Sequence, residues 1–118
     1  MKIVFESDFP PYKLKSFISG FSPENYGINY DIGNSAALGY NSKDEISAYG
    51  DRILNVHIKD RKFKGKTVRL GLGNAKLKKI INFFKKKKYK GNFILQTARN
   101  KQNFHIHEIN LNRDYILQ

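Results

Sequence analysis

Short apolar runs alternate with amphipathic segments along the chain. The apolar runs have the length of β-strands and lie at residues 2–5, 27–30, 52–58 and 92–95. After the first run and Pro10-Pro11, apolar residues recur at the spacing of one helix face, at Leu14, Phe17, Ile18 and Phe21. A weaker helical pattern covers residues 107–117, after the last run. The order β-α-β-α-β-α-β-α predicts an α/β fold of about four parallel strands joined by right-handed crossovers.

Two of the intervening helices have recognisable end signals. Ser42 is expected as the N-cap of one, with Glu45 as its capping-box partner and Gly50 as its stop. Asn74 is expected as the N-cap of the next, whose apolar face contains Leu77, Ile80, Ile81 and Phe84. Residues 59–74, which precede this helix, form a connection too long for a simple turn.

Length and composition narrow the class of protein. With 118 residues, the chain is expected to form a single domain over residues 1–118. No apolar run approaches the roughly 20 residues that cross a bilayer, and residues 1–12 lack the long apolar stretch of a signal peptide. We therefore expect a soluble, cytoplasmic protein with no membrane partner. The absence of cysteine excludes disulfides, thiolate metal ligands and a cysteine nucleophile.

The chain is strongly basic. Its formal charge is +12, from 22 Lys and Arg against 10 Asp and Glu, and such a charge attracts polyanions of any kind. The lysines are scattered among Asn, Ile and Phe, and only residues 85–90 form a block. That block follows an amphipathic helix, where positive charge suits the helix dipole, and no recognised nucleic-acid module accompanies it. The pattern favours a solvated helix end over a nucleic-acid partner.

Polar residues follow or end each predicted strand. Parallel α/β sheets carry function at the C-terminal ends of their strands, and here those ends hold Glu6, Asp31, His57 and Gln96. Each residue alone has an ordinary structural explanation, such as a turn cap for Asp31 or a buried, hydrogen-bonded imidazole for His57. Together, two carboxylates, an imidazole and an amide oxygen form a mixed oxygen and nitrogen shell suited to Mn²⁺, Mg²⁺, Co²⁺ or Zn²⁺.

Four motifs in this order resemble a known family: YDIGN at residues 30–34, VHIKDR at 56–61, LGLGN at 70–74 and YKGNFILQTAR at 89–99. They are similar to the C-terminal half, strands five to eight, of the xylose isomerase-like TIM barrels. Within these, the match favours the sugar phosphate isomerase/epimerase group. The resemblance implies a partial (β/α)8 barrel, that is, a half barrel, because a complete one needs about 250 residues.

The resemblance also implies a chemistry. In the family, carboxylates and a histidine at the strand ends hold a divalent metal, and these roles fall on Glu6, Asp31 and His57. Gln96 stands where the family has a fourth ligand, Glu. The family moves a proton between adjacent carbons of a sugar or sugar phosphate through an enediolate, and Glu6 is the expected catalytic base.

Further residues are expected to contact the substrate. Lys59 shares a strand face with His57 and should point toward the site, whereas Asp60 points away and is expected to brace the following loop. Arg61, Arg99 and Asn34 complete the predicted substrate contacts, and the loop Gly71-Leu72-Gly73 is either an anion site or a tight turn. His105 and His107 are expected on the surface.

Three functions remain possible: a sugar isomerase or epimerase, a DNA-repair nuclease, and a half barrel that is non-catalytic or needs a partner. Gln96 cannot act as the second acid or base that an epimerase needs, so isomerisation with one base is favoured over epimerisation. A DNA-repair nuclease of the endonuclease IV type is disfavoured, because Asn34 stands where those enzymes have His and Asp60-Arg61-Lys62 lacks the histidine of their Asp-Arg-His pattern. The third reading is a non-catalytic truncated or split half barrel, or a chain active only after a partner chain or self-association completes the barrel.

Overall fold

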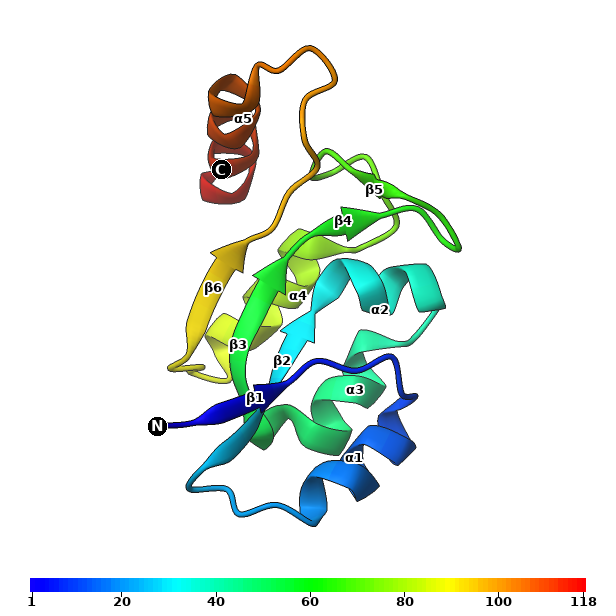
Figure 1. Cartoon of the computed structure of the whole chain (residues 1–118), viewed down its shortest axis with the longest axis vertical. Coiled ribbons are helices and arrows are strands. Elements are labelled where there is room, and N and C mark those ends of the chain that lie inside the picture. The colour runs from blue at the N-terminus through cyan, green and yellow to red at the C-terminus, as the bar shows by residue number, and fades with distance from the viewer.

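A computed structural model describes residues 1–118 as a parallel sheet with helices packed on one face (Figure 1). The sheet has four strands in the order β1-β2-β3-β6, so β1 and β6 are the edge strands. The strands are β1 (Ile3–Phe5), β2 (Tyr26–Asp31), β3 (Ile53–Ile58) and β6 (Asn92–Leu95). All neighbours pair in parallel, which confirms the predicted half of a TIM-barrel sheet.

The segments between these strands contain four α-helices and a short hairpin, and a fifth helix follows the last strand. The helices are α1 (Pro11–Ser19), α2 (Ile32–Leu38), α3 (Ser42–Tyr49), α4 (Leu77–Lys86) and α5 (His105–Leu117), with a short 3₁₀ turn, η1 (Gly50–Arg52), before β3. The hairpin pairs β4 (Asp60–Arg61) with β5 (Thr67–Val68) in antiparallel fashion. In Figure 1, α5 lies beyond the C-terminal end of β6, apart from the helices that cover the sheet.

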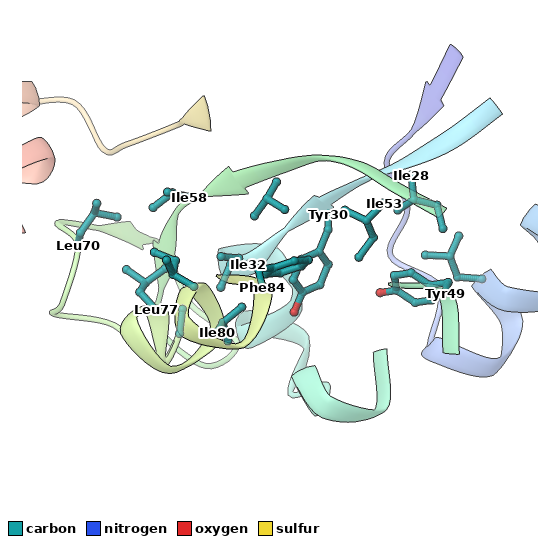
Figure 2. Close-up of a cluster of buried hydrophobic side chains, with 14 of the residues drawn as sticks. Ile28, Tyr30, Ile32, Tyr49, Ile53, Ile58, Leu70, Leu77, Ile80 and Phe84 are labelled. Atoms are coloured by element: carbon teal, nitrogen blue, oxygen red, sulfur yellow. The ribbon is translucent and has the colours of Figure 1, made fainter. Parts of the chain in front are cut away.

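The hydrophobic core fills the layer between the sheet and the helices (Figure 2). Side chains alternate along a strand, so Ile28 and Tyr30 point toward the helices while Asn29 and Asp31 share the opposite face. From the helix side, Phe84 packs against the Tyr30 ring with centroids 6.0 Å apart. The face that carries Asn29 and Asp31 has no helix over it (Figure 1).

Two predicted helix caps are wrong. The N-cap of α3 is Asn41 and not Ser42: the Asn41 side chain accepts hydrogen bonds from the backbone N–H groups of Lys43 and Asp44. Glu45 is no capping-box partner, because its carboxylate is buried and accepts hydrogen bonds from Tyr30, Ser35 and Tyr49. The segment before α3 also forms a helix, α2, which the sequence pattern did not predict.

Asn74 does not cap α4, which begins at Leu77 with no side-chain cap. Instead, Asn74 accepts a hydrogen bond from the backbone N–H of Phe63, which ties the end of the loop to the β4–β5 hairpin. The long connection of residues 59–74 is therefore an ordered excursion of the chain that contains this hairpin.

Asp60 organises the glycine loop, as predicted. Its carboxylate is fully buried and accepts hydrogen bonds from the backbone N–H groups of Gly71, Gly73 and Ala75 at 2.9, 3.0 and 3.0 Å. Gly73 has to be glycine, because a Cβ there would lie 2.0 Å from Asp60 Oδ1. The N–H groups of Gly71 and Gly73 are thus already occupied, and the alternative of an anion site at this loop is wrong.

No helix in the chain combines the length and the apolar character needed to cross a membrane.

Candidate metal centre

The parallel register brings three of the predicted ligands together. Glu6 follows β1, Asp31 ends β2, and His57 lies in β3 directly opposite Asp31. One ligand atom from each residue lies within 4.8 Å of the others. The Nδ1 atom of His57 lies 3.8 Å from Oδ2 of Asp31, and the Asp31 side chain is buried.

Gln96, the fourth predicted ligand, directly follows the last strand, β6. Its backbone N–H donates to the carbonyl of Ile58, which extends the pairing of β3 with β6 by one residue. The side chain consequently reaches back over β3, and its Oε1 lies 3.1 Å from Nδ1 of His57. The fourth strand-end residue therefore lies beside His57, with an amide oxygen in place of a carboxylate.

Asn29 belongs to the same cluster, although its position within an apolar run did not predict this. It precedes Asp31 by two residues on the same face of β2 and is only 8% exposed. Its Nδ2 donates to Oε2 of Glu6 at 3.4 Å and lies 3.3 Å from Nδ1 of His57. Its Oδ1 is buried with no hydrogen-bond partner. The signal that could have found it is a polar side chain at the centre of a strand whose neighbours are buried.

The contacts of His57 test whether a cation fits the cluster. The amide nitrogen of Asn29 calls for a bare lone pair on Nδ1, whereas the carbonyl oxygen of Gln96 calls for a proton on the same atom. One nitrogen cannot satisfy both. A divalent cation accepts lone pairs from Nδ1, from the Gln96 oxygen and from the carboxylates together, so the donor set fits such an ion.

Asn34 holds the carboxylates in place from α2. Its backbone N–H donates to Oδ1 of Asp31 at 2.8 Å, so Asp31 is also the N-cap of α2. Its Nδ2 donates to Oε1 of Glu6 at 3.1 Å. Its Oδ1 accepts a hydrogen bond from Nη1 of Arg61 at 2.9 Å. Asn34 thus joins two of the predicted ligands to a predicted substrate contact.

Positive charge surrounds the same carboxylates. Nζ of Lys59 lies 3.5 Å from Oδ2 of Asp31 and 3.5 Å from Oδ1 of Asn34. Arg61 is fixed by two further hydrogen bonds to the carbonyl of Gly65. Lys59 and Arg61 therefore lie at the rim of the cluster; the alternation along β3 predicted this orientation for Lys59.

Arg99 lies elsewhere. It is exposed and lines a separate pocket of about 580 Å³ beside Lys66, Arg69 and Glu108, and none of the four strand-end residues lines that pocket. His105 and His107 are exposed on α5, as predicted.

Comparison with known proteins identifies the family of the chain. A model of the xylose isomerase-like TIM barrel family matches residues 8–114. The chain belongs to this family. The matched region includes Asp31, His57 and Gln96 but begins after Glu6, so the place of Glu6 in the cluster rests on the structure. The sequence matches none of the curated proteins.

Several solved structures share the fold of the chain. A xylose isomerase domain protein from Planctomyces limnophilus is 17% identical with a TM-score of 0.82, and the alignment covers 99% of this chain and 46% of that one. A D-tagatose 3-epimerase-like protein is 21% identical with a TM-score of 0.73, over 99% of this chain and 47% of that one. A sugar phosphate isomerase/epimerase from Parabacteroides distasonis is 14% identical with a TM-score of 0.67, and the alignment covers 86% of this chain and 34% of that one. The chain thus spans less than half the length of these proteins.

Proposed function

We propose that the chain binds one divalent metal ion through Glu6, Asp31, His57 and Gln96 and supplies the proton-transfer site of a sugar or sugar phosphate isomerase. In this proposal it corresponds to strands five to eight of the family barrel. The observation that carries the proposal is the clustering of side chains from four adjacent strand ends: ligand atoms of Glu6, Asp31 and His57 lie within 4.8 Å of one another, and Gln96 Oε1 lies 3.1 Å from Nδ1 of His57.

A bound Mn²⁺, Mg²⁺, Co²⁺ or Zn²⁺ would supply Lewis acidity, polarising the substrate carbonyl and stabilising negative charge on its oxygen. Glu6 takes the proton from the hydroxyl-bearing carbon next to the carbonyl; the electrons of that C–H bond form a C=C bond, and the π electrons of the carbonyl move to its oxygen to give an enediolate. The same carboxylate then returns the proton to the former carbonyl carbon, and the proton of the substrate hydroxyl passes to the former carbonyl oxygen. Hydrogen bonds from Asn34 and Asn29 to its two oxygens hold Glu6 in one orientation.

Gln96 decides between the two reaction types. Epimerisation needs an acid or base on each face of the carbon, and an amide does not titrate. The other titratable groups of the cluster, Asp31 and His57, serve only as metal ligands in this proposal, so isomerisation with one base fits the site better. Lys59 and Arg61 lie where they would neutralise a substrate oxyanion or phosphate.

The substrate pocket needs more walls than this chain provides. Both edge strands lack an outer partner, and the face that carries Asn29 and Asp31 is open. We propose that activity requires a partner chain, or a second copy, that completes the barrel. The alternative function is a half barrel without catalysis. Phosphodiester cleavage of the endonuclease IV type is the least favoured, because His57 is the only histidine in the cluster.

Metal content tests the proposal directly. Purified protein loaded with Mn²⁺ and desalted should retain one ion per chain by elemental analysis, and His57→Ala or Asp31→Ala should lose it. Glu24→Gln removes an exposed carboxylate outside the cluster and should leave the metal content unchanged. Metal bound to the His57→Ala variant, or a native protein that binds no metal, would contradict the proposal. Isomerisation of ketoses and ketose phosphates is then assayed on metal-loaded protein.

A further inference from the structure

A second pocket lies on the helix side of the sheet, between α2, α3 and the start of α4. Its volume is about 420 Å³, within the range of small-molecule sites. None of Glu6, Asp31, His57 or Gln96 lines it. Tyr30 and Ile32 line it from β2 and α2, and their side chains are part of the core on the opposite side of the sheet from Asn29. The pocket is therefore separate from the candidate metal centre.

The pocket exists because the helices around it pack on different neighbours. Helix α3 packs against α1, and α2 packs against β3 and β4. Helix α4 packs through Phe84 against Tyr30 of β2 and Phe93 of β6. Gly39, with a left-handed φ of 78°, ends α2 and turns the chain toward α3. A space is left where α3 and α4 face each other.

The walls are apolar and the floor is polar but already hydrogen-bonded. Ile46 lines the pocket from α3, and Ile80 and Phe83 line it from α4. At the floor, Glu45 is 1% exposed. Its carboxylate accepts hydrogen bonds from Tyr30 at 3.0 Å, Ser35 at 2.6 Å and Tyr49 at 3.0 Å. Burial raises the pKa of Glu45 above its ordinary value.

The mouth carries unpaired positive charge. Lys43 lines it from the first turn of α3, and Lys76 and Lys79 line it from the start of α4. All three are exposed and none forms an ion pair. Glu45 is the only acidic residue of the lining. A ligand would therefore meet ammonium groups at the mouth and hydrocarbon below them.

We propose that this pocket binds a small amphipathic anion: an aromatic or short aliphatic body with one carboxylate, sulfonate or phosphate group. The body lies against Ile46, Ile80 and Phe83, and the charged group stays at the lysines. A neutral apolar compound would lose the ionic contacts, and a cation would be repelled at the mouth. The proposal does not depend on the metal centre or on catalysis.

Titration of the full chain with anilinonaphthalene sulfonate, followed by amide NMR, tests this proposal. We expect binding of one molecule, with the largest shifts at Ala36, Ile46 and Ile80. The double variant Lys76→Glu/Lys79→Glu should bind at least tenfold more weakly, because it replaces two favourable charges with two unfavourable ones. The double variant Lys86→Glu/Lys90→Glu makes the same change of net charge outside the pocket and should bind as the native chain does.

A variant that fills the pocket tests the proposal without changing any charge. Ala36→Phe places a ring inside the lining and should abolish binding, while circular dichroism confirms that the chain is folded. Equal weakening by both lysine pairs would show attraction to net charge only and would overturn the proposal. Chemical-shift changes centred on Val4 and Ile94, or undiminished binding to the Ala36→Phe variant, would also overturn the proposal.

Discussion

At the scale of single residues, Asn29 holds two proposed ligands at once. Its amide contacts both Glu6 and His57 from a buried position on β2. Asn29→Ala removes both contacts, and we expect Mn²⁺ affinity to fall about 10- to 100-fold, the usual effect of losing a group that orients metal ligands. Isothermal titration calorimetry measures this change.

The matched control for Asn29 is Asn55. It pairs with Asn29 in register on β3, and its only side-chain hydrogen bond is to Asn92, away from the cluster. Asn55→Ala should leave Mn²⁺ affinity within twofold of native. Equal losses in the two variants would mean that the effect comes from the sheet as a whole and not from Asn29.

Gln96 offers the opposite experiment. Gln96→Glu restores a carboxylate 3.1 Å from Nδ1 of His57, and the added negative charge should raise Mn²⁺ affinity at least tenfold, about 1.4 kcal/mol. Gln102→Glu adds the same charge on an exposed loop and should have no such effect. An unchanged affinity in Gln96→Glu would show that residue 96 is not a ligand.

The same residues show what sequence patterns can and cannot predict at this scale. Asp31 and Gln96 could be predicted because a strand end is visible as a change from apolar to polar residues. Asn29 was missed because it lies inside the run, where only its three-dimensional neighbours show that it faces the cluster. The cap of α3 was misplaced by one residue, since Asn41 and Ser42 are both good N-caps and the order of the chain does not choose between them.

At the scale of elements, the apolar runs of the sequence predicted the strands of the sheet, but they did not predict the structure of the connections. Each strand coincides with a short, mostly apolar run, so its position is local information. The β4–β5 hairpin depends on Asp60, which reaches 11, 13 and 15 residues along the chain to bind the backbone of the glycine loop. A contact of that range leaves no periodic trace in the sequence.

Helix α5 depends on an ion pair at its start. Arg69, after β5, donates to both carboxylate oxygens of Glu108 at 2.6 and 2.8 Å. These hydrogen bonds lower the pKa of Glu108 from its ordinary 4.5 to about 2. A lowered pKa means that the stabilisation is fully present above about pH 4.5 and is lost as the pH falls toward 2. We therefore expect α5 to lose hydrogen-exchange protection across that range.

Glu108→Gln is the variant that isolates this effect. It removes the titrating group, so α5 should be less protected at pH 7 and its protection should change little with acid. Glu24→Gln, at an exposed glutamate without an ion pair, should keep the native pH profile. A native profile in Glu108→Gln would show that other groups control the acid response of α5.

At the scale of the whole molecule, the sheet has one covered face and one open face. Phe5 and Phe93 pack on the helix side, against Phe17 and Phe84, so Val4 and Ile94 point to the open face. Both are exposed, and both lie on edge strands whose outer hydrogen-bonding groups have no partner in the sheet. Four further parallel strands would cover this face and pair both edges, as in a complete eight-stranded barrel.

We expect the isolated chain to associate through this face. Light scattering during size-exclusion chromatography should show a dimer at high protein concentration, and Val4→Lys/Ile94→Lys should be monomeric. Each copy carries a formal charge of +12, so salt should strengthen the dimer by screening the repulsion. Leu72→Lys/Ile106→Lys changes two exposed apolar residues outside the sheet and should leave the dimer intact. A monomer that isomerises sugars at full rate would contradict both the association and the need for a completed barrel.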